Sequence, residues 1–117
     1  MITAAILGTI QEAGEAVLTL TEGLEEGELL ASRLTRVEVT RQLGVLASAL
    51  RGLPDSAVRA MPEIDWAGWR GMTTAMSLGG PARDEALWFG VRSLVPATLS
   101  WLRLYRHSHP ELFVYWA

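Results

Sequence analysis

The chain has 117 residues, a formal net charge of −3 and no cysteine. This length fits a single domain, residues 1–117, that can bury one core without a covalent staple. The lack of cysteine excludes a disulfide framework, a thiolate nucleophile and a cysteine-based metal site. With only two histidines, we expect no metal and no cofactor. The acidic balance also argues against RNA binding through a broad basic surface.

Half of the residues are hydrophobic, a high fraction for a soluble monomer, which indicates an interface with another chain. No apolar run reaches the roughly 18 residues that a membrane helix needs. The N-terminal segment also lacks the basic residues that are typical of a signal peptide. We therefore expect a cytoplasmic protein without membrane contact.

Residues 2–22 have the periodicity of an amphipathic helix, and Gly23 suits a left-handed cap at its end. The acidic run 22–28 suits a short loop before the next helix, because carboxylates favour the positive N-terminus of a helix. The apolar face of the first helix is expected to consist of Ile2, Ile6, Ile10, Ala13, Val17 and Leu20.

Residues 26–52 predict one long second helix whose apolar face changes side. Leu30, Leu34 and Val37 share one face, and a second stripe lies about 180° away at about 100° per residue. Either other helices of the same chain cover both faces, or one half of the helix packs on a second subunit. The second stripe consists of Val39, Leu43, Leu46, Leu50 and Leu53.

Pro54 disfavours helix at the residue before it and ends the second helix. Asp55 or Ser56 can then cap a short helical turn that runs through about Met61. The sequence thus predicts one short helix between the second and third long ones.

Asp65 is a favourable N-cap for a third long helix, residues 66–77. Trp66 and Trp69 are spaced by three, so they share a face of this helix. Two large aromatic side chains on one face favour an anchor in the core. The alternative is a surface on which nucleobases stack.

A last helix is expected over residues 82–107, after the Gly-Gly-Pro break at 79–81, with Pro110 beyond its end. Pro96 removes one backbone donor inside it, so we expect a kink within a turn on its N-terminal side. Its apolar stripe, Leu87, Val91, Leu94, Thr98, Trp101 and Tyr105, is widened by Trp88, Val95, Leu99 and Leu102.

The tail, residues 108–117, ends in the apolar and aromatic sequence LFVYWA. Such a segment has to dock on its own bundle or on a partner. Together these patterns predict an all-α, up-and-down bundle of four main helices plus one short helix.

Three segments, in the right order along the chain, resemble the HepT-like family of the HEPN superfamily. Residues 22–36, EGLEEGELLASRLTR, are similar to that family's entry to its second helix. Residues 45–53 carry Ala-Ser-Ala at 47–49, where relatives often have Gly-Glu-Ala. The most specific match is residues 62–66, PEIDW, which is similar to the family's Pro-Glu-Ile-x-Trp. The resemblance covers the chain up to about residue 105.

The resemblance implies a HEPN-like homodimer that pairs with a minimal nucleotidyltransferase antitoxin. The active family members are metal-independent RNases, which use an Arg, then four to six residues, then a His, often followed by x-Tyr. A histidine can move a proton near neutral pH, and an arginine stabilises charge on phosphate. In the family, the tyrosine is where the partner attaches a nucleotide.

Counted from Trp66, the family's Arg position falls on Thr73, its His position on Leu78 and its Tyr position on Gly80. None of these side chains can replace the family residue, since Thr carries no charge, Leu moves no proton and Gly has no hydroxyl. The sequence therefore indicates a degenerate member with no catalytic residues at the family positions.

Arg103, five residues and then His109 also satisfy the loose pattern, near the end of the last helix. Their simpler interpretation is that Arg103 is one of the cations favoured at a helix C-terminus, and that His109 is a solvated tail residue.

These observations lead to three hypotheses about function. The first is a binding partner of a nucleotidyltransferase without RNase activity, the second an active RNase toxin, and the third a substrate-binding helical subunit of a nucleotidyltransferase.

Overall fold

The computed structural model describes residues 2–114, which form helices and turns and contain no strand. The all-α prediction is therefore confirmed for this part of the chain. The five longer helices are α1 (Ile2–Thr21), α3 (Arg33–Arg51), α5 (Trp66–Leu78), α6 (Gly80–Phe89) and α7 (Val95–Ser108). The shorter elements are α2 (Glu26–Ala31), α4 (Asp55–Ala60), the π-helical turn η1 (Gly90–Leu94) and the 3-10 helix η2 (Pro110–Phe113).

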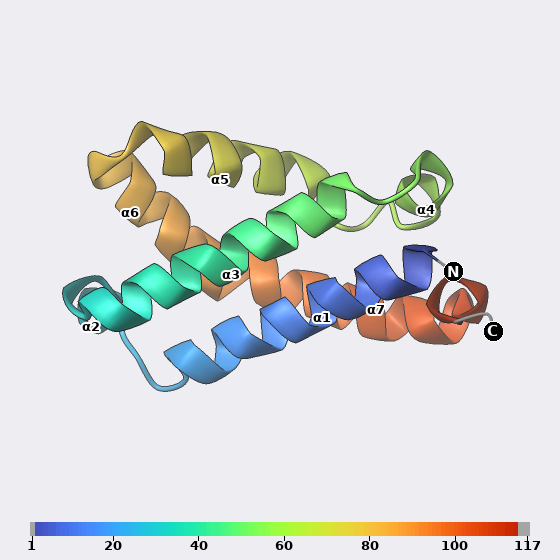
Figure 1. The fold of residues 1–117 in the computed structure, drawn as a ribbon, viewed down its shortest axis with the longest axis horizontal. Coiled ribbons are helices and arrows are strands. Elements are labelled where there is room, and N and C mark those ends of the chain that lie inside the picture. The colour runs from blue at the N-terminus through green and yellow to red at the C-terminus, as the bar shows by residue number, and fades with distance from the viewer. Residues whose placement is uncertain (1, 115–117) are drawn as a thin grey trace.

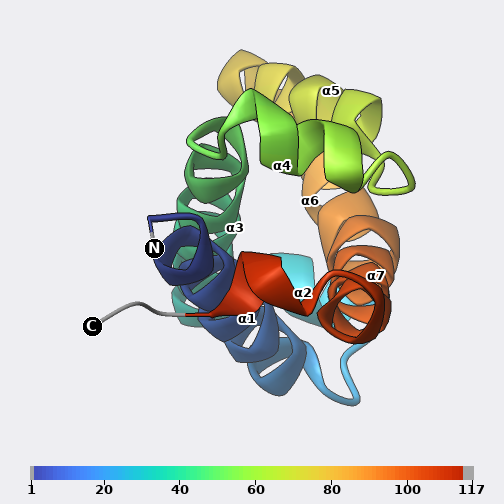
Figure 2. The ribbon, with the colours of Figure 1, turned by 90° about the vertical axis from the view of Figure 1, so that its right-hand side faces the viewer.

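The longer helices lie around one core, and the molecule is elongated, with extents of 44 × 25 × 22 Å. α1 packs along α3, α5 packs on α6, and α7 lies beside α1 (Figure 1). Seen end-on, α1, α3, α5 and α7 surround a common centre (Figure 2), which core side chains fill. The largest fully buried side chains include Leu7, Ile10, Leu43, Leu46, Met61 and Leu87.

The first helix and its cap agree closely with the expectation. α1 ends at Thr21, and Gly23 adopts the left-handed conformation with φ 76°. The buried face is turned slightly from the expected one, because Ala4 and Leu7 are buried while Ile2 is 69% exposed. The assignment of Ile2 to the core is therefore wrong.

The predicted second helix is not continuous, and this expectation was wrong. Ser32 interrupts it with an extended backbone, ψ 100°. The Ser32 hydroxyl donates to Thr35 Oγ1 at 3.0 Å, and the Ser32 carbonyl accepts the first α3 hydrogen bond, from the Arg36 N–H. Serine favours helix N-caps because its side chain competes for backbone groups. Ser32 thus ends α2 and starts α3.

The two apolar faces of the second helical region have different surroundings. The stripe of Val39, Leu43, Leu46, Leu50 and Leu53 is buried, as expected. Of the other face, Leu30 packs against the core, whereas Leu34 is 85% and Val37 57% exposed. The helices of this chain therefore leave Leu34 and Val37 uncovered.

The two breaks between α3 and α5 fall where they were predicted. The short helix α4 follows Pro54, but Pro54 itself is the N-cap and neither Asp55 nor Ser56 takes that place. In contrast, Asp65 caps α5 as expected, because its Oδ1 accepts a hydrogen bond of 2.8 Å from the Gly68 N–H.

The predicted last helix contains a π-helical turn directly before Pro96. In this turn the Val95 N–H donates to the Gly90 carbonyl, five residues back instead of four. Proline lacks an N–H and its ring clashes with the carbonyl four residues earlier, so the regular ladder cannot continue through it. The chain changes direction here, with α6 and α7 at an angle (Figure 1). The kink is therefore confirmed.

The start of the apolar tail docks on the chain's own bundle. Leu112 and Phe113 lie half-buried against the core, and η2 contacts α1. The Arg106 guanidinium lies 4.6 Å from the centre of the Phe113 ring, a cation–π contact. The last part of the tail, 115–117, lies outside the described residues.

Candidate functional site

A cleft of about 620 Å³ opens between α3, α4 and α5. A smaller cavity of about 180 Å³ continues it along α3 and α5, and both are lined by Ala47, Arg51 and Thr73. We call the two together the α3–α5 cleft. It contains one of the family motif positions, Thr73.

The α3–α5 cleft is mostly apolar, with charges at its rim. Arg51, Asp55 and Arg70 line it and are exposed. Two guanidinium groups can bind an anion, but no histidine lines the cleft. The arrangement suits binding better than proton transfer near neutral pH.

The two tryptophans of α5 have their indole nitrogens occupied by the bundle. Trp69 is buried and its Nε1 donates to Thr98 Oγ1 at 2.9 Å. Trp66 is half-buried and its Nε1 donates to the Met61 carbonyl at 3.0 Å. Trp69 is therefore a core anchor and cannot stack on a nucleobase. Trp66 packs against the core and also lines the cleft.

The three family motif positions contain no group that could transfer a proton. The Thr73 hydroxyl donates to the Trp69 carbonyl at 2.9 Å. Leu78, at the end of α5, is 72% exposed. Gly80 has φ 59°, a left-handed conformation that residues with a Cβ rarely adopt. Of these three, only Thr73 lines the cleft.

Arg103 and His109 have different neighbours. Arg103 lines a small cavity between α1 and α7 with Gln11 and Glu15. His109 Nδ1 lies 3.3 Å from Glu111 Oε1, and its ring is tilted against that of Tyr105. His109 lies directly after α7 with φ −134° and ψ 60°, so it does not continue the helix that carries Arg103. Arg103 and His109 share none of these neighbours.

A polar pair that the sequence did not reveal joins the loop before α5 to α7. The Tyr105 phenol donates to Glu63 Oε1, and the Glu63 N–H donates to Tyr105 Oη at 3.1 Å. Burial, and then the hydrogen bond to Glu63, raises the pKa of Tyr105 to about 12. The phenol is neutral at physiological pH, so the hydrogen-bonded pair has a structural role: it holds the loop before α5 against α7. The signal in the sequence was Glu63 of the PEIDW segment, but its partner lies 42 residues away.

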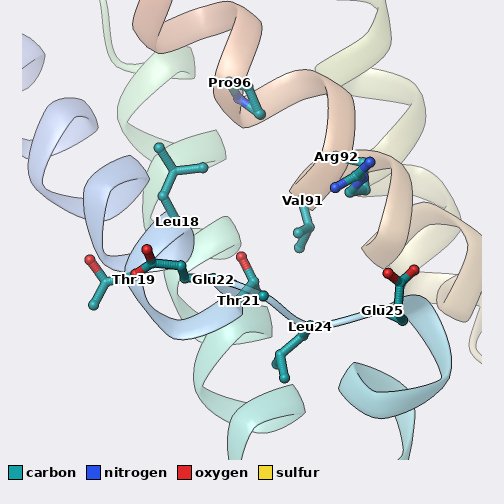
Figure 3. Close-up of a pocket in the computed structure, with 10 residues that line it drawn as sticks. Leu18, Thr19, Thr21, Glu22, Leu24, Glu25, Val91, Arg92 and Pro96 are labelled. Atoms are coloured by element: carbon teal, nitrogen blue, oxygen red, sulfur yellow. The ribbon is translucent and has the colours of Figure 1, made fainter.

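A second pocket, of about 550 Å³, lies where the end of α1 faces the π-helical turn. Figure 3 shows Thr21 and Val91 between Leu18 on one side and Arg92 and Glu25 on the other. The Thr21 hydroxyl donates to the Val17 carbonyl at 2.8 Å, and Arg92 lies 5.5 Å from the centre of the Trp88 ring. The pocket carries charges of both signs and no histidine.

Within residues 2–114, no group of three or more His, Asp or Glu side chains could hold a metal ion. None of the helices in the same range is long and apolar enough to cross a membrane. Comparison of the chain with protein-family models, with curated proteins and with solved structures gives no match. The described residues therefore define an all-α fold with two surface clefts.

Proposed function

We propose that this protein is a non-catalytic binding subunit of the HepT-like type. In this proposal it is a cytoplasmic homodimer that pairs with a minimal nucleotidyltransferase in a module of the toxin–antitoxin type. The PEIDW segment and its two companion segments support the family. The helical bundle, in which Asp65 of that segment caps α5, is compatible with a HEPN-like fold.

The observation that carries the proposal is Leu78. The family resemblance puts a catalytic histidine at this position, and here a leucine stands there with 72% of its surface exposed. An exposed leucine cannot act in acid–base catalysis, but it can be buried against another protein, which removes apolar surface from water. A position used for chemistry in the family is thus suited to contact in this chain.

The α3–α5 cleft, whose larger cavity lies toward the other end of α5 from Leu78, also agrees with a binding role. The rim of the α3–α5 cleft carries Arg51 and Arg70, which can pair with carboxylates of a partner. Loss of acid–base help alone lowers catalysis by about 10²–10⁴-fold, so a cleft without histidine makes a poor RNase. Contact with a protein partner requires neither a base nor a metal.

The test is co-purification of the tagged chain with a minimal nucleotidyltransferase from the same genome. We expect the two proteins to elute together, and Leu78→Glu to reduce the amount of bound partner at least tenfold. The matched control is Ile2→Glu, an equal exchange at an exposed residue of α1. In Figure 1 the start of α1 lies at the opposite end of the molecule from the α5–α6 junction. Failure of the unaltered chain to bind this enzyme would overturn the proposal.

A further inference from the structure

The outward face of α3 has a ridge at one end and a groove at the other. The ridge consists of Leu34 and Val37, which are 85% and 57% exposed. The groove is a shallow cavity between α1 and α3 of about 600 Å³, lined by Ile6, Thr9, Gly44, Val45, Ser48, Ala49 and Gly52. At about 100° per residue, Leu34, Val37, Arg41, Val45 and Ser48 fall within about 80° around the helix axis. Ridge and groove therefore face the same way.

Among the described residues 2–114, nothing covers the groove at Gly44. A Cβ added at Gly44 would meet no atom within 4 Å, and both Gly44 and Ser48 are exposed. Leucine and valine are among the side chains that gain most from burial. The surface therefore combines exposed apolar side chains with a depression that can receive such side chains.

A pair of opposite charges lies between ridge and groove. Glu38 accepts hydrogen bonds from Arg41 Nε at 2.9 Å and from Arg41 Nη2 at 2.7 Å, one turn apart on α3. Hydrogen bonds from Arg41 and Gln42 lower the pKa of Glu38 to about 2. Both groups are thus charged at neutral pH. From the N-terminus to the C-terminus of α3, the ridge is thus followed by the acidic Glu38, then by the basic Arg41, and then by the groove.

We propose that a second copy of this chain packs antiparallel on this face, so that the ridge of each copy enters the groove of the other. This inference deepens the proposed homodimer and rests on it. In an antiparallel pair, the register that sets Glu38 of one copy opposite Arg41 of the other also sets Leu34 opposite Val45. A two-fold axis repeats every contact, as in an isologous interface.

The order of these features along α3 favours a second copy of this chain as the partner, and an antiparallel over a parallel arrangement of the two α3 helices. In a parallel pair, ridge would meet ridge and Glu38 would face its own copy, which is unfavourable for like charges. In the antiparallel pair, both the shapes and the charges are complementary without any contribution from another protein. α3 has 19 residues and is about 28 Å long at 1.5 Å per residue, so the contact can run along the whole helix.

The first test is the solution mass by light scattering at micromolar concentration. We expect the unaltered chain to give twice the 12.8 kDa chain mass, and Leu34→Glu to give the monomer mass. Leu78→Glu, the same exchange at another exposed leucine, is the matched control and should remain dimeric. Ser48→Arg, which places a long charged side chain in the groove, should also give monomers. Both altered side chains are exposed, so folding is retained, and circular dichroism verifies it.

The charge pair gives a test of direction. Glu38→Arg alone and Arg41→Glu alone each place like charges opposite one another in the antiparallel register, so each variant should be monomeric at low salt. Mixed in equal amounts, they should form a heterodimer, since each Arg then faces a Glu of the other variant. If Glu38 and Arg41 interact only within one chain, mixing the two variants will restore no dimer. That result would overturn the proposed register.

Engineered cysteines measure the register directly, because the chain has no cysteine of its own. Leu34→Cys combined with Val45→Cys should give a covalent dimer on oxidation. The two sites on one helix are about 16 Å apart along the axis, too far for a disulfide within the chain. Leu78→Cys should give no such dimer.

A dimer that persists in Leu34→Glu and in Ser48→Arg would overturn this interface and leave the homodimer of the proposed function standing. A monomeric unaltered chain would overturn both the interface and the homodimer. Binding of the nucleotidyltransferase is measured separately, so the outcomes can be distinguished.

Discussion

The indole nitrogen of Trp69 and the hydroxyl oxygen of Thr98 form a hydrogen bond of 2.9 Å that joins α5 to α7 inside the core. The two residues are only 3% and 2% exposed. Inside a protein, such a bond adds little when formed but costs much when one partner is removed, because the other remains buried and unpaired. The pair thus fixes the position of α5, which carries Thr73 and one wall of the α3–α5 cleft.

Thr98→Val keeps the shape of the side chain and removes the acceptor of this bond. We expect the free energy of unfolding to fall by about 1–3 kcal/mol, the cost of an unsatisfied buried donor. Urea denaturation measures this change. Thr98→Ser, which keeps the hydroxyl, is the control for the bond itself and should lose less. Equal losses in the two variants would show that methyl packing, not the hydrogen bond, holds this position.

Tyr105 predicts how stability depends on alkaline pH. Burial and the contact with Glu63 raise the pKa of Tyr105 from 10.0 to about 12 in the folded protein. The unfolded chain therefore releases the phenol proton first, and the stabilising contribution, complete below pH 10, is lost as pH rises toward 12. The free energy of unfolding, measured from pH 10 to about 12, should fall with rising pH. In Tyr105→Phe this free energy should depend less steeply on pH. An equal slope in both proteins would contradict the prediction.

Gly14 and Gly71 lie inside helices but in different surroundings. A Cβ at Gly14 would lie 2.8 Å from Leu99 Cδ2, whereas a Cβ at Gly71 would meet no atom within 4 Å. Alanine is favoured over glycine in a helix by about 1 kcal/mol, but overpacking a core costs about 1–3 kcal/mol. We expect the thermal midpoint of Gly71→Ala to be higher than that of the unaltered protein. The midpoint of Gly14→Ala should be clearly lower than that of Gly71→Ala. The same midpoint for both would show that Leu99 moves aside without cost.

The proposed function predicts that the purified protein does not cleave RNA. Thr73 and Leu78 provide neither charge stabilisation nor proton transfer, and Arg103 and His109 have separate neighbours. The assay uses labelled RNA of mixed sequence, with the unaltered chain beside Arg103→Ala and His109→Ala. All three should leave the RNA intact. Cleavage by the unaltered chain that both variants lose would contradict the prediction and locate the chemistry at the end of α7.

Several features follow from the sequence because they depend on neighbours within one helical turn. Gly23 with φ 76° ends α1, and Asp65 caps α5 through the Gly68 N–H. Pro96 interrupts the hydrogen-bond ladder that precedes it. A cap, a left-handed glycine and a missing donor are local constraints, so the order of residues is sufficient to predict them.

Ser32 was also a local signal, since the Ser-x-x-Thr pattern is compatible with an N-cap, but the strong helical periodicity around it led to the wrong expectation of one helix. Packing decides between the two conformations. The break lets Leu29 be fully buried and leaves Leu34 outside. The exposed ridge on α3 is therefore a consequence of tertiary structure that the periodicity alone did not reveal.

For the candidate site, the sequence determined the residue types: two tryptophans in α5, no histidine or charge at Thr73 and Leu78, and no cysteine anywhere. Only the tertiary structure decided that Trp69 is bonded to Thr98, that Glu63 meets Tyr105, and that Arg51 and Arg70 share one cleft. These contacts join residues from different helices. Their formation depends on how whole helices rotate and pack to bury the core, which no local pattern specifies.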